Sequence, residues 1–254
     1  MNPWIDRNIL IQNTRKFVQQ YGYFFRMNAK RISSLVEISV YNSLVQHYES
    51  QGFQVAGANL GPKKSFKYKL TSSGLAENYS HFTAEKNGKV FQIMHNVSIQ
   101  SAHDAHLYFT ADVVVVEKNG ATTQTLKSGR RHSFVANGDL VTFAEVKHIN
   151  PFPEVLFNFT GLVLEFMPGL IEKRYDIQDS GDRLCPIITF TGVASEHSER
   201  IQDSLTNRYG FNISFGTSKT RGKLTGFASM KRYAEKQKIA SVVPFPVPKR
   251  RIAI

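Results

Sequence analysis

The sequence predicts an α/β fold in which a central mixed β-sheet lies between helices. Helical periodicity opens the chain, strand-like runs fill its middle, and helices and strands alternate towards its end. Two Asn-Gly dipeptides, at 87–88 and 119–120, favour tight turns between strands because both residues accept positive φ, and a third, at 137–138, precedes a further strand. With 254 residues, 41% of them hydrophobic, the chain is long enough to bury a core around this sheet.

Two helices are predicted near the start, at residues 9–25 and 28–51. The second has the stronger signal, because its apolar residues recur at steps of three and four. This stripe comprises Ile32, Leu35, Val36, Val40, Leu44, Val45 and Tyr48. Gly52 follows as a stop signal, and residues 53–60 predict a short strand.

Four strand-like runs make up the middle of the chain, at 80–85, 89–98, 107–117 and 140–149. The first two flank Asn87-Gly88 and predict a hairpin. The third contains Val113–Val116, four β-branched residues in succession, which is typical of a strand buried on both faces. The remaining patterns predict a helix at 154–167, a strand at 186–194, a helix at 198–209 and a strand at 212–216.

We expect three parts: an N-terminal helical segment at 1–27, a folded core at 28–218, and a basic tail at 219–254 that prolines interrupt. No run approaches the roughly 20 apolar residues needed to cross a bilayer. The start of the chain also lacks the pattern of a secretory signal. The one cysteine, Cys185, excludes an internal disulfide and is interpreted as a packing residue. These observations predict a cytoplasmic protein with no membrane partner.

The charge of the chain favours a polyanionic partner. Lys and Arg number 32 against 20 Asp and Glu, which gives a net charge of +12 and a pI near 9.7. The basic residues are clustered in the segments 61–69, 127–131 and 219–238, as expected for nucleic-acid binding. Candidate contacts are Lys63, Lys64, Lys127, Arg130, Arg131 and, beside the motif described next, His148, with Lys67 and Lys69 extending the first cluster. The alternative is a charge that only maintains solubility.

Three acidic residues are candidates for chemistry. Asp112 lies inside the 107–117 strand, where an isolated ionised carboxylate is costly, so we expect it to be protonated, paired or bound to a cation. Glu145 and Lys147 alternate in the next strand and share a face, which predicts either a salt bridge or a pair that binds a metal ion and positions water. Glu37 lies on the apolar stripe of its helix, either at the edge of the core or facing a site.

Histidines offer an alternative constellation. His95, His103 and His106 lie close in sequence, and with neighbouring acids they have the composition of a transition-metal site. We expect His103 and His106 to lie in a turn before the Asp112 strand, where polar residues are common. Phosphate-binding loops, dinucleotide fingerprints and G-x-S-x-G elbows are absent from the sequence.

Taken in order, these residues resemble the PD-(D/E)xK nuclease superfamily, which has a restriction-endonuclease-like fold. The resemblance covers residues 28–218: a helix with an acid, a hairpin, A-D-V-V-V-V at 111–116, E-V-K at 145–147, then a helix and a strand. It implies that Asp112 and Glu145 bind Mg²⁺ (or Mn²⁺) and that Lys147 positions or activates the attacking water. It also implies that the Val146 carbonyl is a further metal ligand and that Glu37 is an outer one.

Two departures from the superfamily pattern are visible. Ala111 replaces a proline, and 32 residues separate Asp112 from Glu145, a long insertion that we assign to an extra hairpin carrying Lys127, Arg130 and Arg131. The resemblance implies a Mg²⁺-dependent DNA endonuclease of the restriction, antiviral-defence or repair type, acting as a homodimer or larger assembly. The alternatives are an RNA-directed nuclease and a non-catalytic nucleic-acid-binding or assembly protein on the same fold.

Overall fold

The computed structural model describes residue 12 and residues 32–117, 120–172 and 182–216. The expected helix at 9–25, most of the segment 1–27 and the whole tail 219–254 lie outside these residues. The described part covers nearly all of the expected core. Its architecture therefore tests the predicted fold class directly.

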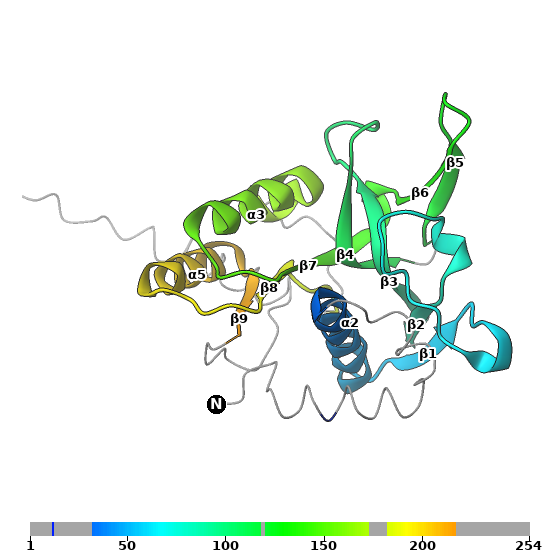
Figure 1. Cartoon of the computed structure of the whole chain (residues 1–254), viewed down its shortest axis with the longest axis horizontal. Helices are drawn as coiled ribbons and strands as arrows, with labels where there is room; N and C mark the ends of the chain where they lie inside the picture. The colour runs from blue at the N-terminus through cyan, green and yellow to red at the C-terminus, as the bar shows by residue number, and fades with distance from the viewer. Residues whose placement is uncertain (1–11, 13–31, 118–119, 173–181, 217–254) are drawn as a thin grey trace, which may run out of the picture.

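The described chain contains four α-helices and nine strands (Figure 1). The helices are α2 (Ile32–Ser50), α3 (Pro153–Phe166), α4 (Pro168–Ile171) and α5 (Glu196–Tyr209). The strands are β1 (Gln54–Ala58), β2 (His81–Lys86), β3 (Lys89–Gln100), β4 (Tyr108–Glu117), β5 (Thr122–Thr125), β6 (Arg131–Val135), β7 (Leu140–Lys147), β8 (Ile187–Phe190) and β9 (Asn212–Phe215).

All nine strands join one mixed sheet, as the sequence predicts. Its main path runs β1-β2-β3-β4-β7-β8-β9, antiparallel from β1 to β7 and parallel from β7 to β9. Off this path, β5 and β6 form an antiparallel ribbon that joins the sheet through a short parallel pairing of β6 with β3. This ribbon is the extra hairpin expected in the insertion between Asp112 and Glu145.

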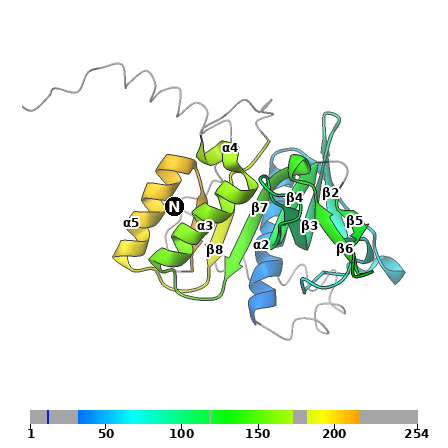
Figure 2. The ribbon, with the colours of Figure 1, turned by 90° about the horizontal axis from the view of Figure 1, so that it is seen from above.

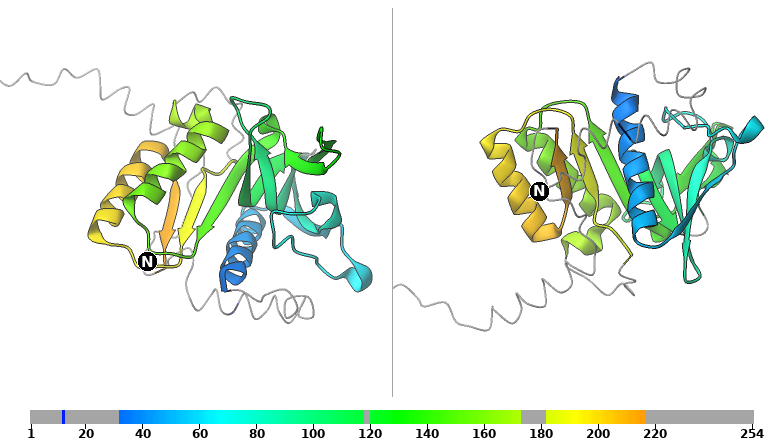
Figure 3. Two further views of the ribbon diagram at one scale, coloured as in Figure 1. Left: turned by 45° about the horizontal axis from the view of Figure 1, so that its top comes forward. Right: turned by 90° about the horizontal axis from the view of Figure 1, so that it is seen from below.

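Helices cover both faces of the sheet (Figure 2). On one face α2 packs over β3, β4 and β7, and its buried stripe meets Val113 and Val115. On the other face α3, α4 and α5 pack over β4, β7, β8 and β9, and meet Val114 and Val116. Seen from below, α2 lies in front of the strands and α3 behind them (Figure 3, right). The four successive valines are thus buried because both faces of β4 are covered.

Local sequence explains where elements begin and end. Asn87 and Gly88 both have positive φ, 50° and 77°, and close the tight turn between β2 and β3. Ser195 caps α5, its hydroxyl accepting a hydrogen bond from the Ser198 N–H, and Gly210 ends the helix in the left-handed region at φ 72°. The bounds differ from expectation mainly at β8, which ends at Phe190 instead of residue 194, where the chain bends at residues 191–192.

Candidate functional site

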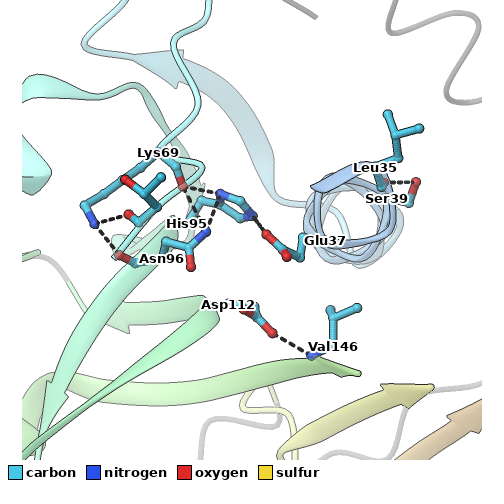
Figure 4. Close-up of polar contacts among 9 residues, drawn as sticks. Leu35, Glu37, Ser39, Lys69, His95, Asn96, Asp112 and Val146 are labelled. Atoms are coloured by element: carbon cyan, nitrogen blue, oxygen red, sulfur yellow. Dashed lines mark hydrogen bonds and ion pairs between the residues drawn. The ribbon is translucent and has the colours of Figure 1, made fainter. Parts of the chain in front are cut away.

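The strands β4 and β7 bring the acidic candidates together. They pair antiparallel with Val113 opposite Ala144, and continuing this register by one residue places Asp112 opposite Glu145. The Asp112 carboxylate accepts a hydrogen bond from the Val146 N–H at 2.7 Å (Figure 4). Asp112 therefore points across to β7 instead of into an apolar layer.

Glu145 and Lys147 form the predicted same-face pair. Lys147 Nζ donates a hydrogen bond to Glu145 Oε2 at 2.5 Å. The Glu145 side chain is 2% exposed and that of Lys147 36% exposed, so the pair runs from the interior to the surface. Glu145 Oε1 is buried without any hydrogen-bond partner in the structure. Such an orphaned carboxylate oxygen is costly unless a proton or a cation occupies it.

Burial and mutual repulsion perturb both acids. Burial, assisted by the negative charge of Asp112, raises the pKa of Glu145 to about 7 although Lys147 acts against this shift. Burial also raises the pKa of Asp112, against the Val146 hydrogen bond and the charge of Lys147. Burial alone lowers the pKa of Lys147, but the carboxylates around it outweigh burial and raise it. The ammonium therefore stays charged while the carboxyl groups hold more protons than usual at neutral pH.

Glu37 lies on α2, the helix that packs over β4 and β7, and is electrostatically coupled to Asp112 and Lys147. Its neighbours on the helical stripe, Val40, Tyr41 and Leu44, are fully buried under the sheet, whereas the Glu37 side chain keeps 18% exposure. Burial and the charge of Asp112 raise its pKa to about 7, while a hydrogen bond from Asn96 and the charge of Lys147 oppose this. From the sequence, Glu37 could lie at the edge of the core or face a site. Its electrostatic coupling to Asp112 and Lys147 favours a side chain that faces the site.

The candidate site has more carboxyl groups than cationic side chains to neutralise them. Three carboxyl groups, Glu37, Asp112 and Glu145, surround one ammonium, and all three have raised pKa values. A divalent cation relieves such an excess, and hard carboxylate oxygens suit Mg²⁺ or Mn²⁺. Nevertheless, no three His, Cys, Asp or Glu side chains of the described chain lie close enough to hold one ion together. The three carboxyl groups therefore do not form one ready ligand set; Asp112 and Glu145 lie opposite each other across β4 and β7, and Glu37 lies outside that pair on α2.

The predicted nucleic-acid contacts lie on separate surface loops. Lys63 and Lys64 are exposed in the β1–β2 connection, and both have left-handed φ, 55° and 56°. Lys127 and Arg130 are exposed in the β5–β6 turn, while Arg131 begins β6 and pairs with Glu77 at 2.7 Å. His148 is exposed just after β7, where its ring nitrogen Nδ1 lies 2.8 Å from the Thr191 hydroxyl.

Lys69 corrects the sequence interpretation of the first basic cluster. Its side chain is not a surface contact: the residue is 4% exposed, and its ammonium group donates to the carbonyls of Thr71 and Asn96. Burial lowers its pKa to about 8. The Lys69 ammonium group therefore satisfies backbone carbonyls inside the fold and is not available to bind a polyanion.

The histidines do not form the alternative metal site. His95 is buried on β3 beside Glu37, whereas His103 contacts the Leu164 carbonyl from the turn before β4. His106 lies further along that exposed turn. Sequence reasoning missed the buried neighbours of Glu37, namely His95 and Asn96, and the buried Lys69 that donates a hydrogen bond to the Asn96 carbonyl. His95 and Asn96 lie on the largely buried strand β3 and Lys69 lies in the β1–β2 connection, so no spacing pattern connects the three.

Comparisons of the chain with protein-family models, with curated proteins and with solved structures find no match. In the described part of the chain, no helix has the length and apolar character required to span a membrane.

Proposed function

We propose that the chain is a Mg²⁺-dependent nuclease with a restriction-endonuclease-like core, which hydrolyses phosphodiester bonds in DNA. One observation carries the proposal: two carboxylates on neighbouring strands and a lysine converge where Glu145 Oε1 is buried without a partner. A buried carboxylate oxygen without a hydrogen-bond partner calls for an explanation, and a divalent cation is one that the neighbouring Asp112 and Lys147 suit. Mn²⁺ is expected to substitute for Mg²⁺.

In this proposal Asp112 and Glu145 hold the ion. When bound, Mg²⁺ supplies charge stabilisation at phosphate and lowers the pKa of water. The Val146 N–H orients the Asp112 carboxylate through its hydrogen bond. Lys147 keeps a positive charge beside both acids, where it can orient water and stabilise the charge that develops on the scissile phosphate. Glu37 is assigned an outer, electrostatic role.

The exposed basic loops support a polyanionic substrate. Lys63 and Lys64 on one loop and Lys127 and Arg130 on the hairpin are free of the ion pair that occupies Arg131. Such residues contact phosphates and position a duplex without reading its bases. Two-strand cleavage requires two sites, so we expect a homodimer or larger assembly. Restriction, antiviral defence and repair are the roles that this chemistry serves elsewhere, by analogy.

A cleavage assay tests the proposal. Purified protein is incubated with plasmid DNA, single-stranded DNA and RNA, with Mg²⁺, with Mn²⁺ and with chelator. We expect cation-dependent cleavage of plasmid, and its loss in Asp112→Asn. Asp104→Asn is the matched control, because Asp104 lies in the exposed turn before β4 and outside the cluster.

Each outcome selects one hypothesis. Cleavage of RNA alone would favour the RNA-directed alternative. Tight DNA binding with no cleavage under any of the cation conditions would favour the non-catalytic binding protein. Equal cleavage by wild type and Asp112→Asn would contradict the assigned site.

A further inference from the structure

Helix α3 exposes apolar side chains where a helix on a protein surface normally carries polar ones. Its inner face packs against the sheet through Phe159 and Val163. On the outer face Phe157 is 52% exposed and Leu164 is 42% exposed, with Gly161 exposed between them. Residues three and four apart lie on one face of a helix, so these three form a single stripe. An exposed apolar stripe of this kind marks a contact surface.

Helix α5 provides the comparison, because it also has 14 residues and lies beside α3 on the same face of the sheet (Figure 2). Its buried face includes Ile201 and Leu205. Its exposed face is polar and carries Glu199, Arg200, Asp203, Ser204 and Arg208. Helix α5 therefore has the ordinary pattern of a surface helix, and the outer stripe of α3 departs from it.

The exposed apolar surface continues at both ends of α3. At the N-terminal end, Ile149, Phe152 and Val193 are exposed on two loops that are hydrogen-bonded to each other. At the C-terminal end, Leu107 is exposed on the turn before β4, and this turn is hydrogen-bonded to the last residues of α3. Of the eight large hydrophobic side chains exposed in the described chain, six lie on α3 or in these adjoining segments. Exposed apolar area is thus concentrated around one helix.

The sequence keeps this surface free of positive charge. The chain carries 32 Lys and Arg in 254 residues, yet residues 149–172 contain none and include only the acids Glu154, Glu165 and Glu172. Proteins bind nucleic acid through Lys and Arg, so this surface does not suit a polyanion. Two copies of a chain with a net charge of +12 repel each other, and the repulsion is least where the contact lacks basic residues. The surface therefore suits a second copy of the chain.

Gly161 lies in the middle of the outer face. Glycine disfavours a helix interior, and the described monomer gives no reason for it, because an added Cβ would have no atom within 4 Å. The open space lets the backbone of another helix approach closely. If two α3 helices cross antiparallel at Gly161, Phe157 of one copy faces Glu165 of the other, and Glu154 faces Pro168. This isologous arrangement places no glutamate opposite a glutamate.

We propose that two copies of the chain associate through the outer face of α3, with the two helices antiparallel and crossing at Gly161. The apolar groups at the N-terminal end of one helix then lie near those at the C-terminal end of the other. Each copy removes Phe157 and Leu164 from water, which drives the association. The contact depends neither on nuclease activity nor on a bound cation.

Sedimentation equilibrium of the full chain, without DNA or divalent cations, measures this association. We expect a dimer at about 100 µM protein. We also expect association to strengthen several-fold between about 0.05 M and about 0.5 M NaCl, because salt screens the repulsion between two basic chains. DNA binding has the opposite salt dependence. A chain that stays monomeric at about 100 µM in high salt, or a dimer that salt dissociates, would overturn the proposal.

Replacement of Gly161 by glutamine separates association from folding. Glutamine is a good helix former and has open space at this position, so Gly161→Gln should have a Tm no lower than that of wild type at low protein concentration. Its side chain blocks the helix crossing and should raise the dimer dissociation constant at least about 10-fold. Ser204→Gln, on the exposed face of α5, is the matched control and should stay within about twofold of wild type. Equal dissociation constants for the two variants would contradict the assigned surface.

Cysteine crosslinking tests the antiparallel geometry. The native Cys185 is 0% exposed, so an introduced surface cysteine is the accessible thiol. A residue on a two-fold axis meets its own copy, so Gly161→Cys should form a disulfide-linked dimer in a glutathione redox buffer, whereas Ser204→Cys should not. Linkage of Gly161→Cys that is no faster than that of Ser204→Cys would overturn the crossing at Gly161. Neither measurement uses DNA cleavage, so the contact and the nuclease proposal fail separately.

Discussion

Replacement of Glu145 by glutamine tests whether the ionised Glu145 carboxylate destabilises the folded protein. Glu145 is 2% exposed, and burial together with Asp112 raises its pKa from 4.5 to about 7. A group whose pKa is raised on folding stabilises the fold while it keeps its proton. That contribution is complete below about pH 4.5 and is lost as the pH rises through about 7. At about 1.4 kcal/mol per pH unit, the whole effect is about 3 kcal/mol.

Glutamine has nearly the same shape and never ionises. In metal-free protein, we therefore expect the wild-type free energy of unfolding to fall by about 3 kcal/mol more than that of Glu145→Gln between about pH 4 and pH 8. At about pH 8 the variant should be the more stable protein, with a Tm higher by roughly 6 to 12 °C. Lys147 loses its partner at little cost, because its side chain is 36% exposed and can be hydrated.

Thermal and urea unfolding in chelator, at several pH values, measure the difference. Glu117→Gln is the control, because Glu117 lies on the same strand as Asp112 but pairs with Arg183 and is 47% exposed. Added Mn²⁺ should stabilise wild type at high pH and leave Glu145→Gln unchanged. A variant that is less stable than wild type at about pH 8, or that shows the same pH dependence, would refute the reasoning.

Three further experiments test the proposed role of Lys147, the DNA contacts of the β5–β6 hairpin and the packing of α3. Lys147→Met should lower kcat for cleavage by about 100- to 1000-fold with little change in DNA affinity, whereas Lys89→Met should leave both unchanged; similar rates for the two variants in a cleavage assay would contradict the assigned role. Charge reversal at Lys127 and Arg130 should weaken DNA binding at every sequence and reduce the salt slope of log Kd by about 2, measured by fluorescence anisotropy; an unchanged slope would remove the hairpin from the interface. Phe159→Ala should lower the free energy of urea unfolding by about 3 to 5 kcal/mol, and a loss below about 1 kcal/mol would mean that α3 is not packed as described.

The sequence predicted the fold where a pattern is set by a single local cause. The Asn87-Gly88 turn and the valines at 113–116 depend on turn geometry and two-sided burial, and both appear where expected. The α2 stripe depends on periodicity; Val40, Leu44, Val45 and Tyr48 are buried as expected, whereas Leu35 and Val36 are only half-buried. The end of β8 at Phe190 did not follow, because no local sequence signal marks the bend at residues 191–192. The pairing of β6 with β3 also had no local signal, since strand partners are chosen by tertiary packing.

Part of the candidate site was predictable because it also depends on a local sequence pattern. Alternation along β7 places Glu145 beside Lys147 from sequence alone, and the structure has them in contact. The burial of Lys69 was missed, because a lysine in a basic segment has no local mark that distinguishes a buried from an exposed ammonium group. His95 beside Glu37 was missed because the two residues lie on separate elements that only the packing of α2 on β3 joins.

The central claim is that Asp112 and Glu145 share one divalent cation. Anomalous diffraction from crystals soaked in Mn²⁺ locates such an ion directly. We predict one strong peak between the two carboxylates, in contact with the buried Glu145 Oε1 and beside the Lys147 ammonium group. Electron density showing Glu145 still paired only with Lys147, with Mn²⁺ bound elsewhere or nowhere, would contradict the claim.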